Sequence, residues 1–195
     1  MSARETGKYI SARDRLLDAA YALFAAEGIA RVGIDRILDR SGCARGSLYY
    51  NFQSKDELAL AFLDRHEAVW TRAWLEDGIR DRADTPEGRL LAIFDLFDEW
   101  FRRDGFEGCA FINVMLESEP GSEIRASATE HLARIRDVVR DIADEGGLDR
   151  PDDFAQAWHI LMKGSVVSAG EGNRNAARTA RRAAALVLQG WPRRR

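Results

Sequence analysis

The stretch IDRILDRSGCARGSLYYNF, residues 34–52, is the part of the sequence that decides the fold. Ile34 and Leu38 lie one helical turn apart and predict a first short helix with one apolar face. Gly42 interrupts this spacing, and glycine suits the end of a helix because it tolerates a left-handed backbone. A second short helix follows, with Leu48 facing inward. Two short helices joined by a glycine-containing turn are typical of a helix-turn-helix, whose second helix enters the major groove of DNA.

The composition favours an all-helical protein with a substantial core. The chain has 195 residues, of which 46% are hydrophobic and 31% are charged. It contains only 4 prolines and almost no alternating β-branched runs, so helices are expected throughout. Nothing approaches the roughly 20 consecutive apolar residues of a membrane span. Cys43 and Cys109 lie in unrelated settings, which favours reduced thiols and a cytoplasmic protein over a disulfide framework.

The charge distribution permits, but does not by itself indicate, a nucleic-acid partner. The net charge is −3. Residues 1–50 carry eight basic and six acidic side chains, a balance of +2, so the remainder carries −5. A local basic face can bind phosphate while the rest of the molecule is acidic. Residues 1–15 are polar and lack the apolar segment of a secretion signal.

Capping motifs place the helices on either side of the opening stretch. Ser11 and Asp14 resemble a capping box at the start of a helix that ends at Gly28. Ser54 and Glu57 form the complete S-x-x-E box and begin a helix of more than 20 residues. We therefore expect two domains: a helix-turn-helix DNA-binding domain over residues 10–55, with the motif itself at about 33–52, and an effector-binding and dimerisation domain over residues 56–195.

The second domain is also expected to be helical. Thr85 and Pro86 mark a helix start, as cap and first helical residue, and Asn173 is a possible cap for the last helix. Apolar spacing and punctuation by proline and glycine predict elements over residues 86–103, where Asp104-Gly105 ends the helix, and over residues 108–117, 122–145, 151–170 and 176–189.

Several of these motifs resemble one known family. The first helix ends in LFAAEG, and the segment ID-RI--RSG follows it. The segment RGSLYYNF comes next and is separated from SKDEL by a single glutamine. Residues 11–60 resemble the N-terminal DNA-binding domain of the tetracycline-repressor (TetR) family of bacterial transcription regulators. The resemblance implies about nine helices, a homodimer formed by the last two helices as a four-helix bundle, a ligand cavity in the C-terminal domain, and no catalysis.

The resemblance assigns the DNA contacts. Arg45 is the candidate for a base contact, because its guanidinium can pair bidentately with guanine; the alternative is a phosphate-bound or solvated charge. Lys55 stands at a helix N-terminus, which favours a phosphate, although it can also be an ordinary exposed lysine. The predicted DNA-binding residues are Arg45, Gly46, Ser47, Tyr49, Tyr50, Asn51 and Lys55.

Two residues depart from the family pattern. Gly33 stands where a threonine or serine usually caps the first helix of the motif and contacts phosphate. Ala44 stands where a serine or threonine cap is common before the second helix, and the loss of such a cap costs about 1 kcal/mol. DNA affinity is therefore expected to depend more on the remaining contacts.

Small residues near the C-terminus suggest close helix packing. We interpret them as a dimer interface, because two recognition helices must reach successive major grooves of a palindromic site. The alternative is close packing within one subunit. The predicted interface residues are Gly164, Ser165, Ser168, Ala169, Ala180, Ala183 and Ala184.

Aromatic and polar residues of the second domain are candidates for an effector pocket. An apolar wall with a few polar groups suits a small organic molecule, whereas the alternative interpretation is an ordinary aromatic core. The candidates are Trp70, Trp74, Trp100, Phe101, Phe111, Asn113, Met115, Trp158, His159 and Met162.

The sequence offers no catalytic or metal motif. It contains no nucleophile–base set, and its 3 histidines form no ligand spacing. Cys109 could sense oxidants or electrophiles, but its apolar neighbours favour a buried structural cysteine.

We therefore expect a sequence-specific DNA-binding regulator in the cytoplasm. It would be a repressor that a small organic effector releases from a palindromic operator, with no cofactor, no metal and no membrane association. The alternative is a helical small-molecule carrier or protein-binding adaptor with no DNA function. A steep salt dependence of DNA binding would distinguish the first from the others.

Overall fold

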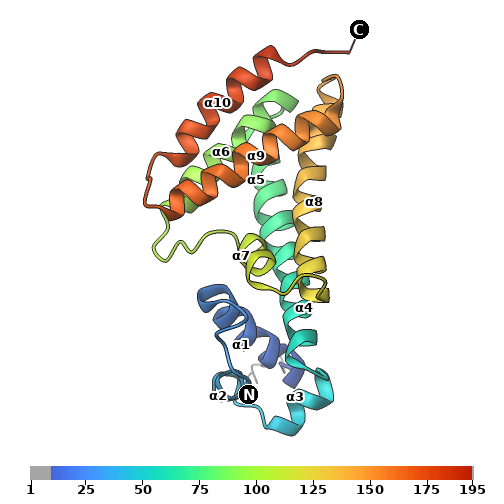
Figure 1. The fold of residues 1–195 in the computed structure, drawn as a ribbon, viewed down its shortest axis with the longest axis vertical. Coiled ribbons are helices and arrows are strands. Elements are labelled where there is room, and N and C mark those ends of the chain that lie inside the picture. The colour runs from blue at the N-terminus through green and yellow to red at the C-terminus, as the bar shows by residue number, and fades with distance from the viewer. Residues whose placement is uncertain (1–9, 195) are drawn as a thin grey trace, which may run out of the picture. The chain divides into compact units, whose positions relative to one another are not determined.

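The computed structural model describes residues 10–194, which are almost entirely helical (Figure 1). Residues 1–9 of the polar N-terminal segment, and Arg195, lie outside the described residues. The chain divides into two compact units, the first ending at Phe62 and the second beginning at Leu63. Within the described part, the only β-type pairing is an isolated bridge between Leu148 and Arg193. The all-helical fold class predicted from the sequence is thus confirmed.

The first unit contains three short helices. They are α1 (Ala12–Glu27), α2 (Ile34–Ser41) and α3 (Arg45–Asn51). The Ser11 hydroxyl accepts a hydrogen bond from the Asp14 amide and so caps α1 as expected. α1 packs against both α2 and α3. The apolar side chains that face one another are buried: Leu16, Ala20, Phe24, Ile37, Leu48 and Phe62.

The first unit extends further than the expected boundary after residue 55. The helix α4 (Lys55–His66) begins with a capping box, in which the Ser54 hydroxyl accepts from the Glu57 amide and the Glu57 carboxylate accepts from the Gln53 amide. Leu58 and Phe62 on its first turns are buried. Phe62 packs edge-on against the rings of Tyr21 and Phe24 of α1. These turns therefore complete the core of the first unit.

The chain continues from α4 without leaving helical geometry. A π-helical segment, η1 (Glu67–Glu76), follows α4 and leads into α5 (Asp77–Arg82), so one long helix covers residues 55–82. The sequence predicts a helix of this position and length, but not its π-helical middle. π-helical turns are rare in proteins, and those that occur are often found at functional sites.

The second unit contains five further helices after residue 82. They are α6 (Pro86–Phe101), α7 (Ala110–Glu117), α8 (Glu123–Glu145), α9 (Pro151–Gly170) and α10 (Ala176–Gly190). α8 contacts α6, α7 and α9, while α10 lies along α6 and α9 (Figure 1). Thr85 and Ser122 cap α6 and α8 through their hydroxyls. With residues 55–82 counted as one helix, the described residues form nine helices, as expected.

One predicted cap is wrong. The N-cap residue of α10 is Asn175 rather than Asn173. The Asn173 side chain instead accepts a hydrogen bond from the Asn175 amide and donates one to the Ser168 hydroxyl, so it stabilises the turn that precedes the helix. In the described residues, no helix is both long enough and apolar enough to cross a membrane.

Candidate functional site

The turn between α2 and α3 is fixed by backbone conformation and by two buried side chains. Gly42 adopts a left-handed conformation with φ 63° and ψ 25°, and its amide donates to the Leu38 carbonyl. Cys43, directly after it, is buried, and Leu48 is fully buried on the inner face of α3. These contacts determine which face of α3 remains in solvent.

That outer face of α3 carries large side chains with hydrogen-bonding groups. Tyr50 is 90% exposed and Tyr49 is 46% exposed, although both are aromatic. Ser47 and Asn51 are half-buried, and the Asn51 amide donates to the Ser47 carbonyl at 2.7 Å. A Cβ on Gly46 would meet no atom within 4 Å, so another molecule can approach the backbone there. Exposed tyrosines on a short, well-anchored helix are typical of a binding surface rather than of a core.

Arg45 is held by an acidic neighbour. Its guanidinium forms an ion pair with Asp35, which lies in the first turn of α2. Both side chains are well exposed, at 56% and 79%, so the pair contributes little to stability. The pair instead orients the Arg45 side chain, and Asp35 competes with any other acceptor for it.

The two departures from the family pattern have structural consequences. Gly33 and Ala44 are the N-cap residues of α2 and α3, and neither supplies a side-chain hydrogen bond to the helix.

Lys55 begins α4 and is half-buried, and it forms no ion pair with any described residue. The positive charge of Lys55 is therefore available to an anion.

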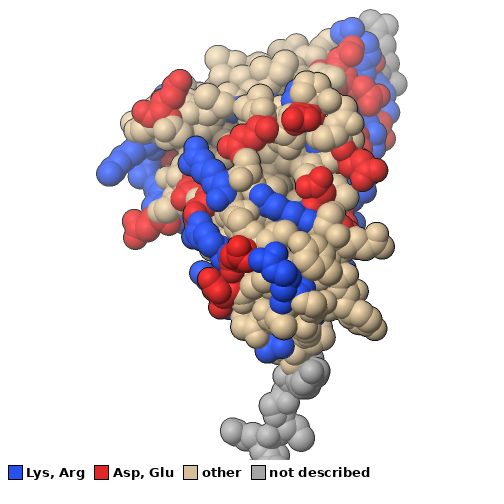
Figure 2. Space-filling model, turned by 60° about the horizontal axis from the view of Figure 1, so that its bottom comes forward, with Lys and Arg blue, Asp and Glu red and all other residues tan. Residues whose placement is uncertain are grey.

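Charge on the protein surface is mixed rather than uniformly basic. In the view of Figure 2, Lys and Arg side chains lie among Asp and Glu side chains. Two basic side chains of the first unit are paired with carboxylates: Arg45 with Asp35, and Arg36, whose guanidinium makes a bidentate contact with Glu27 at 2.6 and 2.7 Å. This pairing agrees with the small positive balance of residues 1–50.

Part of the predicted dimer interface is buried within the chain. Ser165 donates from its hydroxyl to the Met162 carbonyl and is buried, and Ala180 and Ala184 are buried on the inner face of α10. These three predictions are corrected, because α10 packs against α6 and α9 through the face that carries Ala180 and Ala184, and Ser165 of α9 is likewise buried within one chain. Gly164 is exposed, while Ser168, Ala169 and Ala183 are partly exposed.

The outer faces of α9 and α10 carry exposed apolar side chains that the sequence analysis missed. Ile160 and Val167 of α9 are 69% and 55% exposed, and Leu186 of α10 is 71% exposed. Ile160, Gly164 and Val167 follow helical spacing and so share one face of α9. The missed signal is that helical spacing, which places Ile160 and Val167 on the same face of α9 as the predicted interface residue Gly164.

An aromatic cluster lies in the second unit. Trp70 and Trp74 of η1 are 5.0 Å apart between ring centroids, and Trp70 lies 5.2 Å from Trp100 of α6. Trp74 stacks parallel to Phe97 at 6.5 Å. Ligand pockets are lined predominantly by hydrophobic and aromatic side chains such as these.

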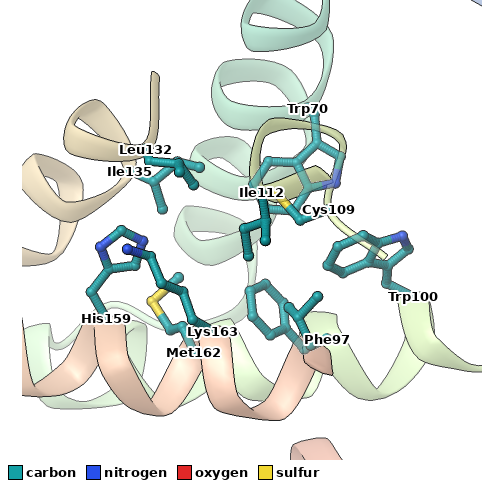
Figure 3. A pocket seen from close by; sticks show the side chains of 11 residues that line it. Trp70, Phe97, Trp100, Cys109, Ile112, Leu132, Ile135, His159, Met162 and Lys163 are labelled. Atoms are coloured by element: carbon teal, nitrogen blue, oxygen red, sulfur yellow. The ribbon is translucent and has the colours of Figure 1, made fainter. Parts of the chain in front are cut away.

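A small cavity of about 20 Å³ adjoins this cluster. Four of the ten predicted pocket residues line it: Trp70, Trp100, His159 and Met162. Seven further residues line it that the sequence analysis did not select: Phe97, Cys109, Ile112, Leu132, Ile135, Lys163 and Val166. Figure 3 shows two different ends, with Trp70, Phe97 and Trp100 together at one end and His159 and Lys163 together at the other.

The other six predicted pocket residues lie outside this lining. Trp158 is fully buried and packs against Phe94 and Phe154, which makes it a core residue. Phe111 is buried between His66 and His131. Trp74 and Phe101 belong to the aromatic cluster, Met115 is half-buried, and Asn113 is exposed beside a second hollow that shares Cys109, Ile112 and Val166.

The titratable groups of the cavity are shifted toward their neutral forms. Burial, and secondarily the charges of Lys163 and Arg136, lower the pKa of His159 to about 3, so its imidazole is neutral at pH 7. Burial, followed by the charge of Arg136, also lowers the pKa of Lys163. Burial raises the pKa of the Cys109 thiol, which disfavours the reactive thiolate.

The described residues bring together no group of three or more His, Cys, Asp or Glu side chains that could hold a metal ion. The candidate functional features of the described residues are an exposed helix in the first unit, and a cavity and an apolar outer helix face in the second.

Comparison with known proteins gives consistent relatives. Residues 16–62 match the sequence model of a family described as bacterial regulatory proteins, tetR family. An uncharacterized HTH-type transcriptional regulator from Lactococcus lactis is 29% identical over 133 residues, which are 68% of this chain and 66% of that protein. The HTH-type transcriptional activator FasR of Mycolicibacterium smegmatis is 46% identical over 92 residues, which are 47% of this chain and 41% of FasR.

The similarity to a solved structure extends over both units. A crystal structure of a TetR-family transcriptional regulator from Streptomyces coelicolor is 29% identical, with a TM-score of 0.80, and covers 91% of this chain and 94% of its own. By contrast, the chain spans at most about two thirds of the length of the two relatives matched by sequence.

Proposed function

Because the chain belongs to the TetR family of bacterial transcriptional regulators, we propose that it is a homodimeric repressor that a small organic effector releases from a palindromic operator. The exposed outer face of α3 carries this proposal. Tyr49, Tyr50 and Arg45 stand in solvent on a helix that is anchored through Leu48 and preceded by the left-handed turn at Gly42. This is the arrangement of a recognition helix.

Each residue of this face has a proposed role. Arg45 would leave Asp35 and pair with the O6 and N7 atoms of guanine, whose two acceptors match its guanidinium. The hydroxyls of Ser47 and Tyr50 would bind phosphates, and Tyr49 would contact phosphate or a thymine methyl group. Gly46 would allow the backbone to approach the DNA, and Asn51 would support the end of the helix through its bond to Ser47. Lys55 would bind phosphate.

The outer faces of α9 and α10 are proposed to form the dimer interface. Ile160, Val167 and Leu186 would be covered by their copies in the second chain, and the small residues Gly164 and Ala183 would permit close approach. Twofold symmetry makes the interface self-complementary, and it places two recognition helices on half-sites about 34–36 Å apart.

Effector control would act through the long helix over residues 55–82. Its first turn carries Lys55 of the proposed DNA surface, and its π-helical part carries Trp70 of the cavity wall. An occupant that favours one position of this helix would lower the affinity for DNA, and DNA would lower the affinity for the occupant by the same factor. The cytoplasm is the proposed location, and no catalytic step is proposed.

The test is a titration of a fluorescein-labelled duplex that carries the protein's own selected binding site, followed by anisotropy. Arg45→Ala is expected to weaken binding to this duplex by about 1–3 kcal/mol, or roughly 5- to 150-fold, and to leave binding to a scrambled duplex nearly unchanged. The matched control is Arg174→Ala, which removes an exposed arginine from the second unit. Equal loss on both duplexes would show that Arg45 contacts phosphate rather than a base.

Absence of any salt-dependent binding to either duplex would contradict the DNA function itself. The carrier or adaptor alternative would then take its place. One relative is described as a transcriptional activator, so activation is the alternative to repression for the same DNA-bound dimer. A reporter gene placed behind the selected site distinguishes them, because deletion of the protein raises expression under repression and lowers it under activation.

A further inference from the structure

The cavity of the second unit is chemically divided, and this division indicates what it binds. Figure 3 shows Trp70, Phe97 and Trp100 at one end. At the other end, the His159 imidazole and the Lys163 side chain lie together, facing Leu132 and Ile135. The lining contains no aspartate or glutamate.

Positive charge at this end has no acidic partner. The charges of Lys163 and Arg136 both lower the pKa of His159. Neither of these two side chains forms an ion pair within residues 10–194. Many other arginines of the chain are paired with carboxylates, as in the 2.8 Å contact between Arg82 and Glu99. The charges of Lys163 and Arg136 at the His159 end of the cavity are therefore not neutralised by a carboxylate of the described residues.

An unpaired ammonium beside apolar walls is costly, because it gives up water without gaining a counter-charge. A negatively charged group that enters the cavity would supply that counter-charge, and charge-assisted hydrogen bonds are the strongest that side chains make. The neutral imidazole of His159 can add an N–H donor without adding charge. The polar end is thus built to accept an anion.

The opposite end restricts the rest of the ligand. Three aromatic rings offer flat apolar surfaces and favour stacked or edge-on contact with another ring. The space open between these side chains is only about 20 Å³, room for about one water molecule, so a ligand enters only by displacing lining side chains, which favours one or two rings over a long chain or a nucleotide conjugate.

We propose that the effector is a small aromatic carboxylate, with its carboxylate on Lys163 and His159 and its ring against Trp70, Phe97 and Trp100. This inference rests on the proposed function, since it takes the cavity as the effector site. It adds the chemical class of the ligand and the residue that selects it. Trp70 would report occupancy directly to the long helix, because it belongs to η1.

Calorimetric titration of the full chain, without DNA, tests the proposal. The probes are benzoate and 1-naphthoate, each compared with its neutral amide of the same shape. At pH 7.5 at least one acid is expected to bind about tenfold or more tightly than its amide, since only the acid forms a charge-assisted bond. Lys163→Met is expected to bring the acid and the amide to within about threefold of each other, while Lys163→Arg keeps the preference.

Arg174→Met is the matched control, because it removes an exposed cation of the same unit that lies outside the cavity lining. Lys163→Gln is measured in parallel, and circular dichroism verifies that each variant is folded. The proposal is overturned if neither acid binds, if an amide binds as tightly as its acid, or if folded Lys163→Met and Lys163→Gln keep the acid preference. It is also overturned if Arg174→Met loses that preference equally.

The two proposals fail separately. Failure of acid binding by a protein that still binds its selected duplex overturns the ligand class and leaves the regulator intact. Acid binding by a protein that binds no duplex supports the ligand class and overturns the regulator.

Discussion

Leu186 provides a quantitative test of the proposed dimer, because its side chain is 71% exposed on the outer face of α10. Complete burial of a leucine side chain is worth about 1.5–3 kcal/mol, so covering the exposed part is worth about 1–2 kcal/mol. In a twofold dimer each substitution occurs twice, which gives about 2–4 kcal/mol. Leu186→Arg should therefore raise the dimer dissociation constant by roughly 30- to 700-fold, before any repulsion between the two new charges.

Sedimentation equilibrium over a wide concentration range measures this change directly. Leu116→Arg is the matched control, since Leu116 of α7 is 68% exposed and lies outside the proposed interface. The control should keep the dissociation constant of the unmodified chain. A Leu186→Arg protein that dimerises as tightly as the unmodified chain, or an equal effect of both substitutions, would refute the assignment of the outer faces of α9 and α10.

Two further predictions concern stability. Ala44→Ser should raise the free energy of unfolding by about 1 kcal/mol in a urea titration, because position 44 has extended N-cap geometry at φ −71° and ψ 153° and lacks a side-chain cap; no gain, or a loss, would contradict the capping argument. His159→Gln should reduce by about 2 kcal/mol the loss of unfolding free energy that occurs between pH 7.5 and pH 5.0. The pKa of His159 is about 3 in the folded chain and near 6.5 in the unfolded chain, so acidification protonates the unfolded chain first and destabilises the fold. An unchanged loss of stability in the variant would contradict the buried neutral imidazole.

The sequence predicts those parts of the fold that depend on local chemistry. The caps at Ser11, Ser54, Thr85 and Ser122 are set by side chains three residues or fewer from the amide they bind. The left-handed turn at Gly42 likewise follows from a single residue type. Such features are read directly from the chain, and they place the outer face of α3 correctly in solvent.

Features that depend on packing between distant segments could not be predicted in the same way. Small residues on α10 fit both a dimer interface and internal packing, and only the position of α6 and α9 shows that Ala180 and Ala184 are already covered. Lys163 carries no sequence signal as a cavity residue, because only the packing of α9 against α8 brings it into one lining with Leu132 and Ile135. The extension of the first unit to Phe62 depends on contacts with Tyr21 and Phe24.

The measurement that tests the central claim most directly is the selection of bound duplexes from a random DNA pool by the purified chain at near-physiological salt. The account predicts recovery of an inverted repeat whose half-sites are centred about one helical turn, or a multiple of it, apart, because a twofold dimer must present two α3 helices to successive major grooves. Recovery of no common sequence by a folded, dimeric protein would contradict it.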